Sequence, residues 1–134
     1  MLPFEFIIEG TPVSQQTRNR QRLQAWKTEV GNAARRQIPS NFLIISTEIE
    51  VTITYYHDGA TPDVDNIIKP IQDALIGIIY DDDKQVVETK SRKKSINNSY
   101  KIKGVSAVLL SGFASGNDFL HIKISEAQIS EVLD

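Results

Sequence analysis

The sequence predicts a single compact α/β (α+β) domain over residues 1–134, with a mixed β-sheet and helices packed on it. The chain is 134 residues long, enough to bury one hydrophobic core but short for two typical domains. It is 40% hydrophobic and 24% charged, as is usual for globular proteins. Apolar residues recur at every second position in some stretches and at every third or fourth in others. These stretches alternate in the order β-α-β-α-β-α-β.

The first half of the chain predicts a strand, a helix and a second strand. Residues 3–9 alternate apolar and polar side chains, which indicates a strand with one buried face. Residues 20–37 carry apolar side chains at helical spacing, and Pro39 ends the helix. Trp26 could stack on a base, but its place on the apolar stripe favours the core. The clearest strand lies within residues 42–56.

A second helix is expected after Asp65, and either Asp65 or Asn66 is a suitable N-cap. Pro70 must lie near its first turn, because deeper in a helix it would remove a backbone hydrogen bond and clash with the preceding turn. Residues 63–69 therefore read as a tight entry into the helix.

The remaining elements follow the same alternation. We expect a strand over residues 86–94, a short apolar helix over 105–113 and a last strand over 119–124. The acidic end, residues 126–134, is expected to form a short helix or a frayed tail.

Several classes of protein are disfavoured by composition. Cysteine is absent, so disulfides and thiolate zinc sites are excluded, and a cytoplasmic protein is expected. The first ten residues lack the features of a signal peptide, and no apolar stretch approaches the length of a membrane span. Glycine-rich phosphate loops, serine elbows and His-Glu zinc signatures are also absent.

Residues 61–85 concentrate six of the seventeen acidic residues of the chain, with only Lys69 and Lys84 against them. The six are Asp63, Asp65, Asp73, Asp81, Asp82 and Asp83. Carboxylates brought together repel one another and require a cation or another polar role. An Asp pair plus a third Asp suits a hard divalent ion such as Mg²⁺. An EF-hand is excluded, because Ile68 and Ala74 replace its turn glycine and closing glutamate.

Lys69 is the cation of this segment that a phosphoryl-transfer site could use. It follows Asp65 by four residues, so we expect both side chains on one helix face. Carboxylates, a metal ion and a positioned lysine form the parts of a phosphoryl-transfer centre. Asp73 follows Lys69 by four residues, and a simple ion pair between them is the alternative.

Basic residues flank the acidic segment, although the net charge is −2. Arg18, Arg20 and Arg22 cluster at the start of the first predicted helix, where cations oppose the helix dipole and favour an external anion such as phosphate. Along the strand after Asp83, alternate positions share one face, and they hold Glu88, Lys90, Arg92 and Lys94. That strand either contacts a DNA backbone or is an exposed edge guarded by lysines. Solvated basic surface is the alternative for either group.

A composite motif runs through this acidic segment. Its parts are Asp63-Val64-Asp65-Asn66-Ile67-Ile68-Lys69, then Asp73-Ala74-Leu75, then Tyr80 to Asp83 and Gln85-Val86. The pattern resembles the RusA family of Holliday-junction resolvases, whose pattern runs D-x-D-N-x-x-K, D-A-L and D-D-x-Q-V. The match covers about 25 residues with the internal spacing intact.

The resemblance implies a RusA-like fold and a homodimeric, Mg²⁺-dependent endonuclease that resolves four-way DNA junctions by paired nicks, with Mn²⁺ as a possible substitute. It implies that Asp63, Asp65 and Asp83 are catalytic and metal-binding, and that Lys69 is catalytic. Asp82, Asn66 and Asp73 would support them. The arginines at 18, 20 and 22 and the cations at 90, 92 and 94 would contact DNA. Roles in DNA recombination and DNA repair follow from the same resemblance.

Other interpretations remain open on the residues alone. The chain could be a metal-dependent nuclease acting on other branched DNA. It could instead be a non-catalytic module that binds DNA junctions, or an unrelated α/β domain with a solvated acidic surface.

Overall fold

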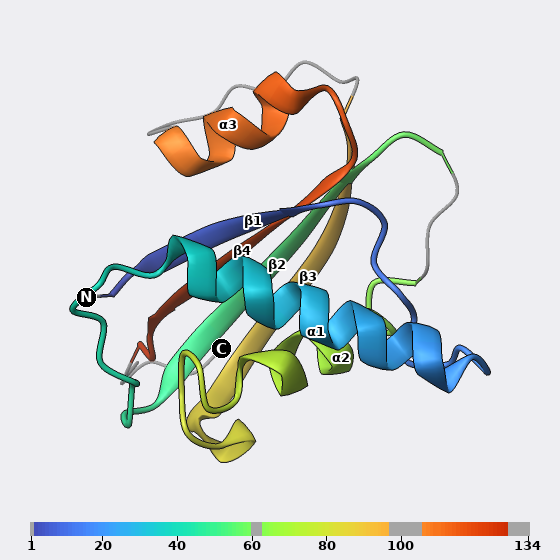
Figure 1. The fold of residues 1–134 in the computed structure, drawn as a ribbon. Coiled ribbons are helices and arrows are strands. Elements are labelled where there is room, and N and C mark those ends of the chain that lie inside the picture. The colour runs from blue at the N-terminus through green and yellow to red at the C-terminus, as the bar shows by residue number, and fades with distance from the viewer. Residues whose placement is uncertain (1, 60–62, 97–105, 129–134) are drawn as a thin grey trace, which may run out of the picture.

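A computed structural model describes residues 2–59, 63–96 and 106–128. Its elements are β1 (Phe4–Glu9), α1 (Arg20–Gln37), β2 (Ile49–His57), α2 (Ile68–Leu75), the short 3-10 helix η1 (Asp83–Gln85), β3 (Val86–Ser95), α3 (Ala107–Ser115) and β4 (Phe119–Glu126). Apart from the added η1, the predicted order is confirmed, and the fold is α+β with a mixed four-stranded sheet and three helices (Figure 1).

The sheet has the strand order β1-β4-β2-β3. β4 lies between β1 and β2 and runs antiparallel to both, whereas β2 and β3 are parallel. Parallel neighbours require a crossover connection, and here α2 forms part of it. β1 and β3 are the two edge strands, so β3 has the edge position considered from its lysines.

One face of the sheet carries the main hydrophobic core. Ile53 of β2 and Ile122 of β4 are fully buried there, beneath α1 and α2. Trp26 of α1 is also in this core, as predicted. Figure 1 shows α1 lying across the sheet with α2 beside it.

The opposite face of the sheet is covered in part by α3. Phe113 of α3 packs edge-on against Tyr56 and Phe119, which stack on each other. A Cβ added to Gly112 would lie 2.4 Å from a ring carbon of Phe119, so glycine is needed for this close approach. The helix expected over residues 105–113 is present, but α3 begins and ends two residues later, at Ala107–Ser115. Position 105 is outside the described residues.

The N-terminus of α2 differs from the expectation. The cap is Ile67, whose side chain makes no capping hydrogen bond, and not Asp65 or Asn66. Pro70 explains the difference, because it has no N–H to donate to the Asn66 carbonyl four residues earlier. The Gln15 N–H donates to that carbonyl instead, at 2.8 Å. The helix starts at Ile68, and Pro70 lies in its first turn, as expected.

The C-terminal expectation falls largely outside the described residues. β4 extends to Glu126, and positions 129–134 are not described. No helix of the described ranges combines the length and the apolar character needed to cross a membrane.

Candidate active site

Asp63 and Asp65 lie on an exposed turn before α2 that three hydrogen bonds hold in place. The Asn66 N–H donates to the Asp63 carbonyl at 3.0 Å, which closes the turn. The Ser91 hydroxyl of β3 donates to the Val64 carbonyl at 2.6 Å. With the bond from Gln15, the turn is fixed to the sheet on one side and to the loop before α1 on the other. Both carboxylates are exposed to solvent.

Asp83 lies at a second acidic turn, where η1 leads into β3. The Asp82 carboxylate caps this short helix by accepting the Lys84 N–H at 3.0 Å. That hydrogen bond lowers the pKa of the Asp82 carboxyl, with the neighbouring Asp83 as the next cause. Asp82 thus has a structural role here, while the Asp83 side chain remains exposed.

Gln85 clamps this second turn to the segment before β2. Its side-chain Oε1 accepts the N–H groups of Asp81 and Asp82 at 2.8 and 2.9 Å. Its Nε2 donates to the carbonyls of Ile45 and Thr47 at 2.8 and 2.9 Å. We did not predict this role. The sequence feature that could have indicated it is the three-residue spacing of Asp82 and Gln85, which is that of a capping box.

The two acidic turns stand apart along β3. Ser91 holds the first turn near the middle of β3, whereas Asp83 precedes the first residue of the strand. Five strand residues separate these points, which is roughly 16 Å. α2 returns along this length, and the Gln72 amide donates to the Thr89 hydroxyl at 2.7 Å.

The metal site expected from three carboxylates is not assembled in the described ranges, since no three acidic or histidine side chains there are grouped closely enough to hold one ion. Mg²⁺ commonly takes only one or two protein carboxylates and fills its other positions with water and substrate phosphate. The exposed oxygen donors of Asp63 and Asp65 suit such an ion in chemistry. The assignment of all three carboxylates to one ion stays a prediction.

Lys69 points to a different partner from the one expected. Asp65 lies before α2, so the four-residue helical spacing to Lys69 does not apply. The Lys69 Nζ is instead 3.4 Å from Asp73 Oδ1, the alternative considered from the sequence. The other oxygen of Asp73 is 3.7 Å from the Nζ of Lys27 on α1. No sequence signal indicated Lys27, because the contact depends on how two helices pack.

Tyr80 is buried between α2 and the second acidic turn. Its hydroxyl donates to the Gln72 carbonyl at 2.7 Å, which fixes the backbone beside Asp73. Burial raises the pKa of the Tyr80 phenol strongly, and the carboxylates of Asp73 and Asp83 raise it further. Both carboxylates are therefore within electrostatic reach of one phenol.

Asp118 holds the end of β2, from which the chain runs toward the first acidic turn. Its carboxylate accepts the Tyr55 hydroxyl at 3.1 Å and the Asp58 N–H at 3.0 Å. Burial raises the pKa of the Tyr55 phenol, so this hydroxyl stays a donor. We did not predict this contact, which joins residues 60 positions apart in the sequence.

The predicted DNA contacts fall on different sides of the sheet. The arginine cluster (Arg18, Arg20 and Arg22) is exposed at the start of α1. The loop before it contacts the first acidic turn through Gln15 and Asn66.

The basic strip (Lys90, Arg92 and Lys94) points away from α2. Its residues pair with Thr52, Thr54 and Tyr56 of β2, on the face that α3 partly covers. Ser91, which holds the first acidic turn, points to the other face. The basic strip shares one face, as predicted, but that face is not the one beside α2.

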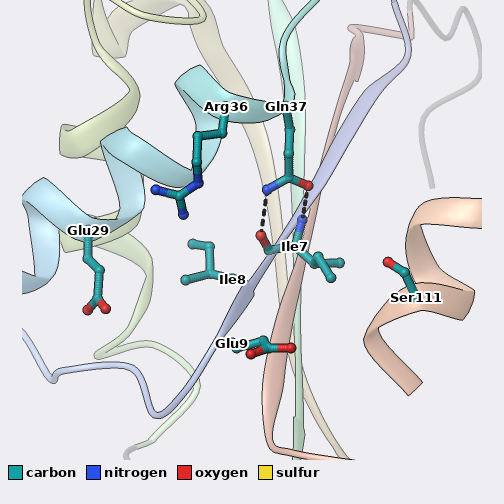
Figure 2. A pocket seen from close by; sticks show the side chains of 7 residues that line it. All are labelled: Ile7, Ile8, Glu9, Glu29, Arg36, Gln37 and Ser111. Carbon is teal, nitrogen blue, oxygen red and sulfur yellow. Dashed lines mark hydrogen bonds between the residues drawn. The ribbon is translucent and has the colours of Figure 1, made fainter. Parts of the chain in front are cut away.

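One hollow of the surface lies away from these residues. A cleft of about 400 Å³ opens where the C-terminal half of α1 meets β1 and α3 (Figure 2). In it the Gln37 amide closes the β1 edge, accepting the Ile7 N–H at 3.1 Å and donating to the Ile7 carbonyl at 2.8 Å. None of the candidate catalytic carboxylates lines it. Asp63, Asp65 and Asp83 are instead exposed on the surface, which suits a polymeric substrate.

Comparison with known proteins identifies the family. No curated protein matches the chain. The sequence pattern of a family described as Endodeoxyribonuclease RusA matches residues 9–103, which is well over half of the chain. The match covers both acidic turns, α2, the arginine cluster and the basic strip. The chain belongs to the RusA family of endodeoxyribonucleases, enzymes that resolve Holliday junctions.

Proposed function

We propose that this protein is a divalent-metal-dependent endonuclease that cuts four-way DNA junctions by paired nicks during DNA recombination and repair. The observation that carries the proposal is the arrangement around α2 in a chain of this family. Exposed carboxylates lie on the turns before and after the helix, Lys69 lies on it, and the loop that leads to the arginine cluster contacts the first acidic turn.

Asp63 and Asp65 are the residues that would hold the metal ion, and Asp83, on the second acidic turn that stands apart along β3, would supply a further carboxylate to the site. Their hard oxygen donors favour Mg²⁺, with Mn²⁺ as a substitute. A bound divalent ion supplies Lewis acidity and an activated water for phosphodiester hydrolysis. The exposure of all three carboxylates leaves room for waters and for substrate phosphate.

The protein's own groups would position the substrate and stabilise charge. The ammonium of Lys69 would interact with the negative charge that develops on the phosphate or on the leaving oxygen. Asn66 and Asp82 support the two turns through the hydrogen bonds described above. The arginine cluster would bind the phosphate next to the one that is cut.

Junction selectivity calls for two sites acting together. Phosphate contacts carry no sequence information, and one small site reads only local geometry. A two-fold homodimer would place two such sites on opposing strands of a four-way junction. Paired nicks follow from that symmetry.

The test is cleavage of a labelled mobile four-way junction, with and without Mg²⁺. Wild-type protein should give paired, symmetric nicks only with the metal. Asp65→Asn and Asp83→Asn should lose cleavage while they keep junction binding. Asp81→Asn is the matched control, since it removes one charge from the same segment at a position outside the proposed site, and it should cut normally.

The same assay separates the alternatives. Equal cutting of flaps, single strands and duplex would indicate a metal-dependent nuclease for other branched DNA. Tight junction binding without cutting in Mg²⁺ or Mn²⁺ would indicate a binding module. Normal cleavage by Asp83→Asn would contradict the assignment of that residue.

A further inference from the structure

Asp73 bridges two lysines from two different helices. One carboxylate oxygen is 3.4 Å from the Lys69 Nζ on α2, and the other is 3.7 Å from the Lys27 Nζ on α1. The three groups lie where α1 and α2 pack together, with Lys27 and Asp73 both lining a groove between them. They form a charge row with one net positive charge.

The three side chains differ in exposure in a consistent way. The side chains of Lys27 and Asp73 are 25% and 26% exposed, whereas that of Lys69 is 60% exposed. The inner pair is therefore shielded from water more than the outer lysine. The Lys69–Asp73 pair is the more exposed of the two and adds little to stability, so its main effect is to hold the Lys69 ammonium in place.

The row lies between the two acidic turns. α2 begins beside the turn of Asp63 and Asp65, and the Tyr80 hydroxyl holds the backbone next to Asp73 at its other end. Tyr80 also begins the segment that leads into the second turn, so this hydrogen bond ties the backbone beside Asp73 to that segment. Lys69 is thus held on the stretch of surface that links the carboxylates of the proposed site.

We propose that Lys27 and Asp73 are positioning residues that orient Lys69 for the phosphoryl-transfer step. The proposal rests on the function proposed above and adds residues to it. Asp73 holds the Lys69 ammonium on the open side of α2, and Lys27 holds Asp73 from behind. Neither Lys27 nor Asp73 touches the DNA.

The charges give each substitution a direction. Asp73→Asn leaves two lysines with no anion between them, so they repel each other and Lys69 moves freely. Lys27→Met keeps most of the length of the side chain but removes the charge that anchors Asp73 from the α1 side. Lys27→Arg keeps the charge and should restore the anchor.

The main measurement is the single-turnover rate of junction cleavage, beside the junction dissociation constant. We expect the rate to fall about tenfold for Asp73→Asn and about threefold for Lys27→Met, because small misplacement of a reacting group is costly. Junction affinity should change less than twofold, and Lys27→Arg should cleave like wild type. Arg36→Met removes a cation from the same helix on the β1 side and should not change the rate.

A double-mutant cycle tests whether Asp73 acts through Lys69. On a Lys69→Met background, Asp73→Asn should cause no further loss, because residues that act as one unit are not additive. Additive losses, or wild-type rates for both single variants, would overturn the proposal. If the wild type cuts no branched DNA, the proposed function itself is wrong and this proposal falls with it.

A readout independent of cleavage guards against misfolded variants. With ¹⁵N-labelled lysine, the side-chain amino resonance of Lys69 reports how ordered its Nζ is. It should be more ordered in the wild type than in Asp73→Asn, with unchanged backbone spectra. Equal mobility of Lys69 in both proteins would overturn the positioning role, whatever the cleavage rates.

Discussion

Replacing Gln85 by leucine should weaken the second acidic turn and, with it, the placement of Asp83. The Gln85 side chain makes four hydrogen bonds, two accepted from backbone N–H groups and two donated to backbone carbonyls. Only the bond to Ile45 is partly buried, and water can replace the other three. At about 1 kcal/mol for a buried bond and less for exposed ones, the unfolding free energy should fall by about 2 kcal/mol.

Urea unfolding measures this loss directly. A decrease of about 2 kcal/mol corresponds to a midpoint lower by roughly 1 M urea for a protein of this size. Gln85→Glu should be at least as damaging, since a carboxylate oxygen would then face the carbonyls of Ile45 and Thr47. Gln21→Leu, on the exposed surface of α1, is the matched control and should leave the midpoint unchanged.

Cleavage by Gln85→Leu, measured under conditions where the variant stays folded, separates the effect of Gln85 on the position of Asp83 from its effect on stability. If Gln85 positions Asp83, the rate should fall by more than the small unfolded fraction explains. A Gln85→Leu protein with a wild-type urea midpoint and a wild-type rate would refute the clamp.

Three further predictions concern charge, packing and pH. Replacing the arginine cluster with glutamines should reduce the slope of log affinity against log salt by about 3 if each arginine neutralises one phosphate. Replacing the basic strip should reduce this slope less. Gel-shift titrations at several salt concentrations measure both slopes. Gly112→Ala should cost about 1–3 kcal/mol in urea unfolding, because its Cβ would overlap the Phe119 ring, whereas Ser111→Ala should cost little. Burial lowers the pKa of the His121 imidazole below 6.5 against the opposing effect of Glu5. The unfolded chain therefore takes up this proton at a higher pH than the folded protein does. The contribution of neutral His121 to stability is complete above about pH 6.5 and is lost as the pH falls from there through the depressed pKa of the folded protein. His121→Leu should flatten that dependence in urea unfolding measured across this range.

Local periodicity predicted most of the elements. α1 spans residues 20–37 in the sequence interpretation and in the structure, because its apolar stripe packs on the sheet and Pro39 follows its end. The strands were predicted for the same reason, since alternation with period two survives burial of one face. The start of α2 was not predicted correctly, because Pro70 left the Asn66 carbonyl to a donor from a loop 51 positions earlier.

Placement of the site depended on contacts that no local pattern encodes. That Lys90, Arg92 and Lys94 share one face follows from alternation alone. Which face it is depends on the register of β3 with β2, and so on long-range packing. The contact of Lys27 with Asp73 likewise requires the crossing of two helices.

The motif contains two kinds of residue: those whose side chains are free to contact a metal ion or the substrate, and those that hold the turns in place. Asp63, Asp65 and Asp83 present exposed carboxylates, whereas Gln85 has all its described hydrogen bonds directed to backbone groups. The spacing of the motif follows from this division, because α2 must return along β3 from the turn held by Ser91 to the turn clamped by Gln85. A longer or shorter α2 would move Lys69 relative to both turns. The spacing of the motif over about 25 residues is therefore what a site spread across two clamped turns requires.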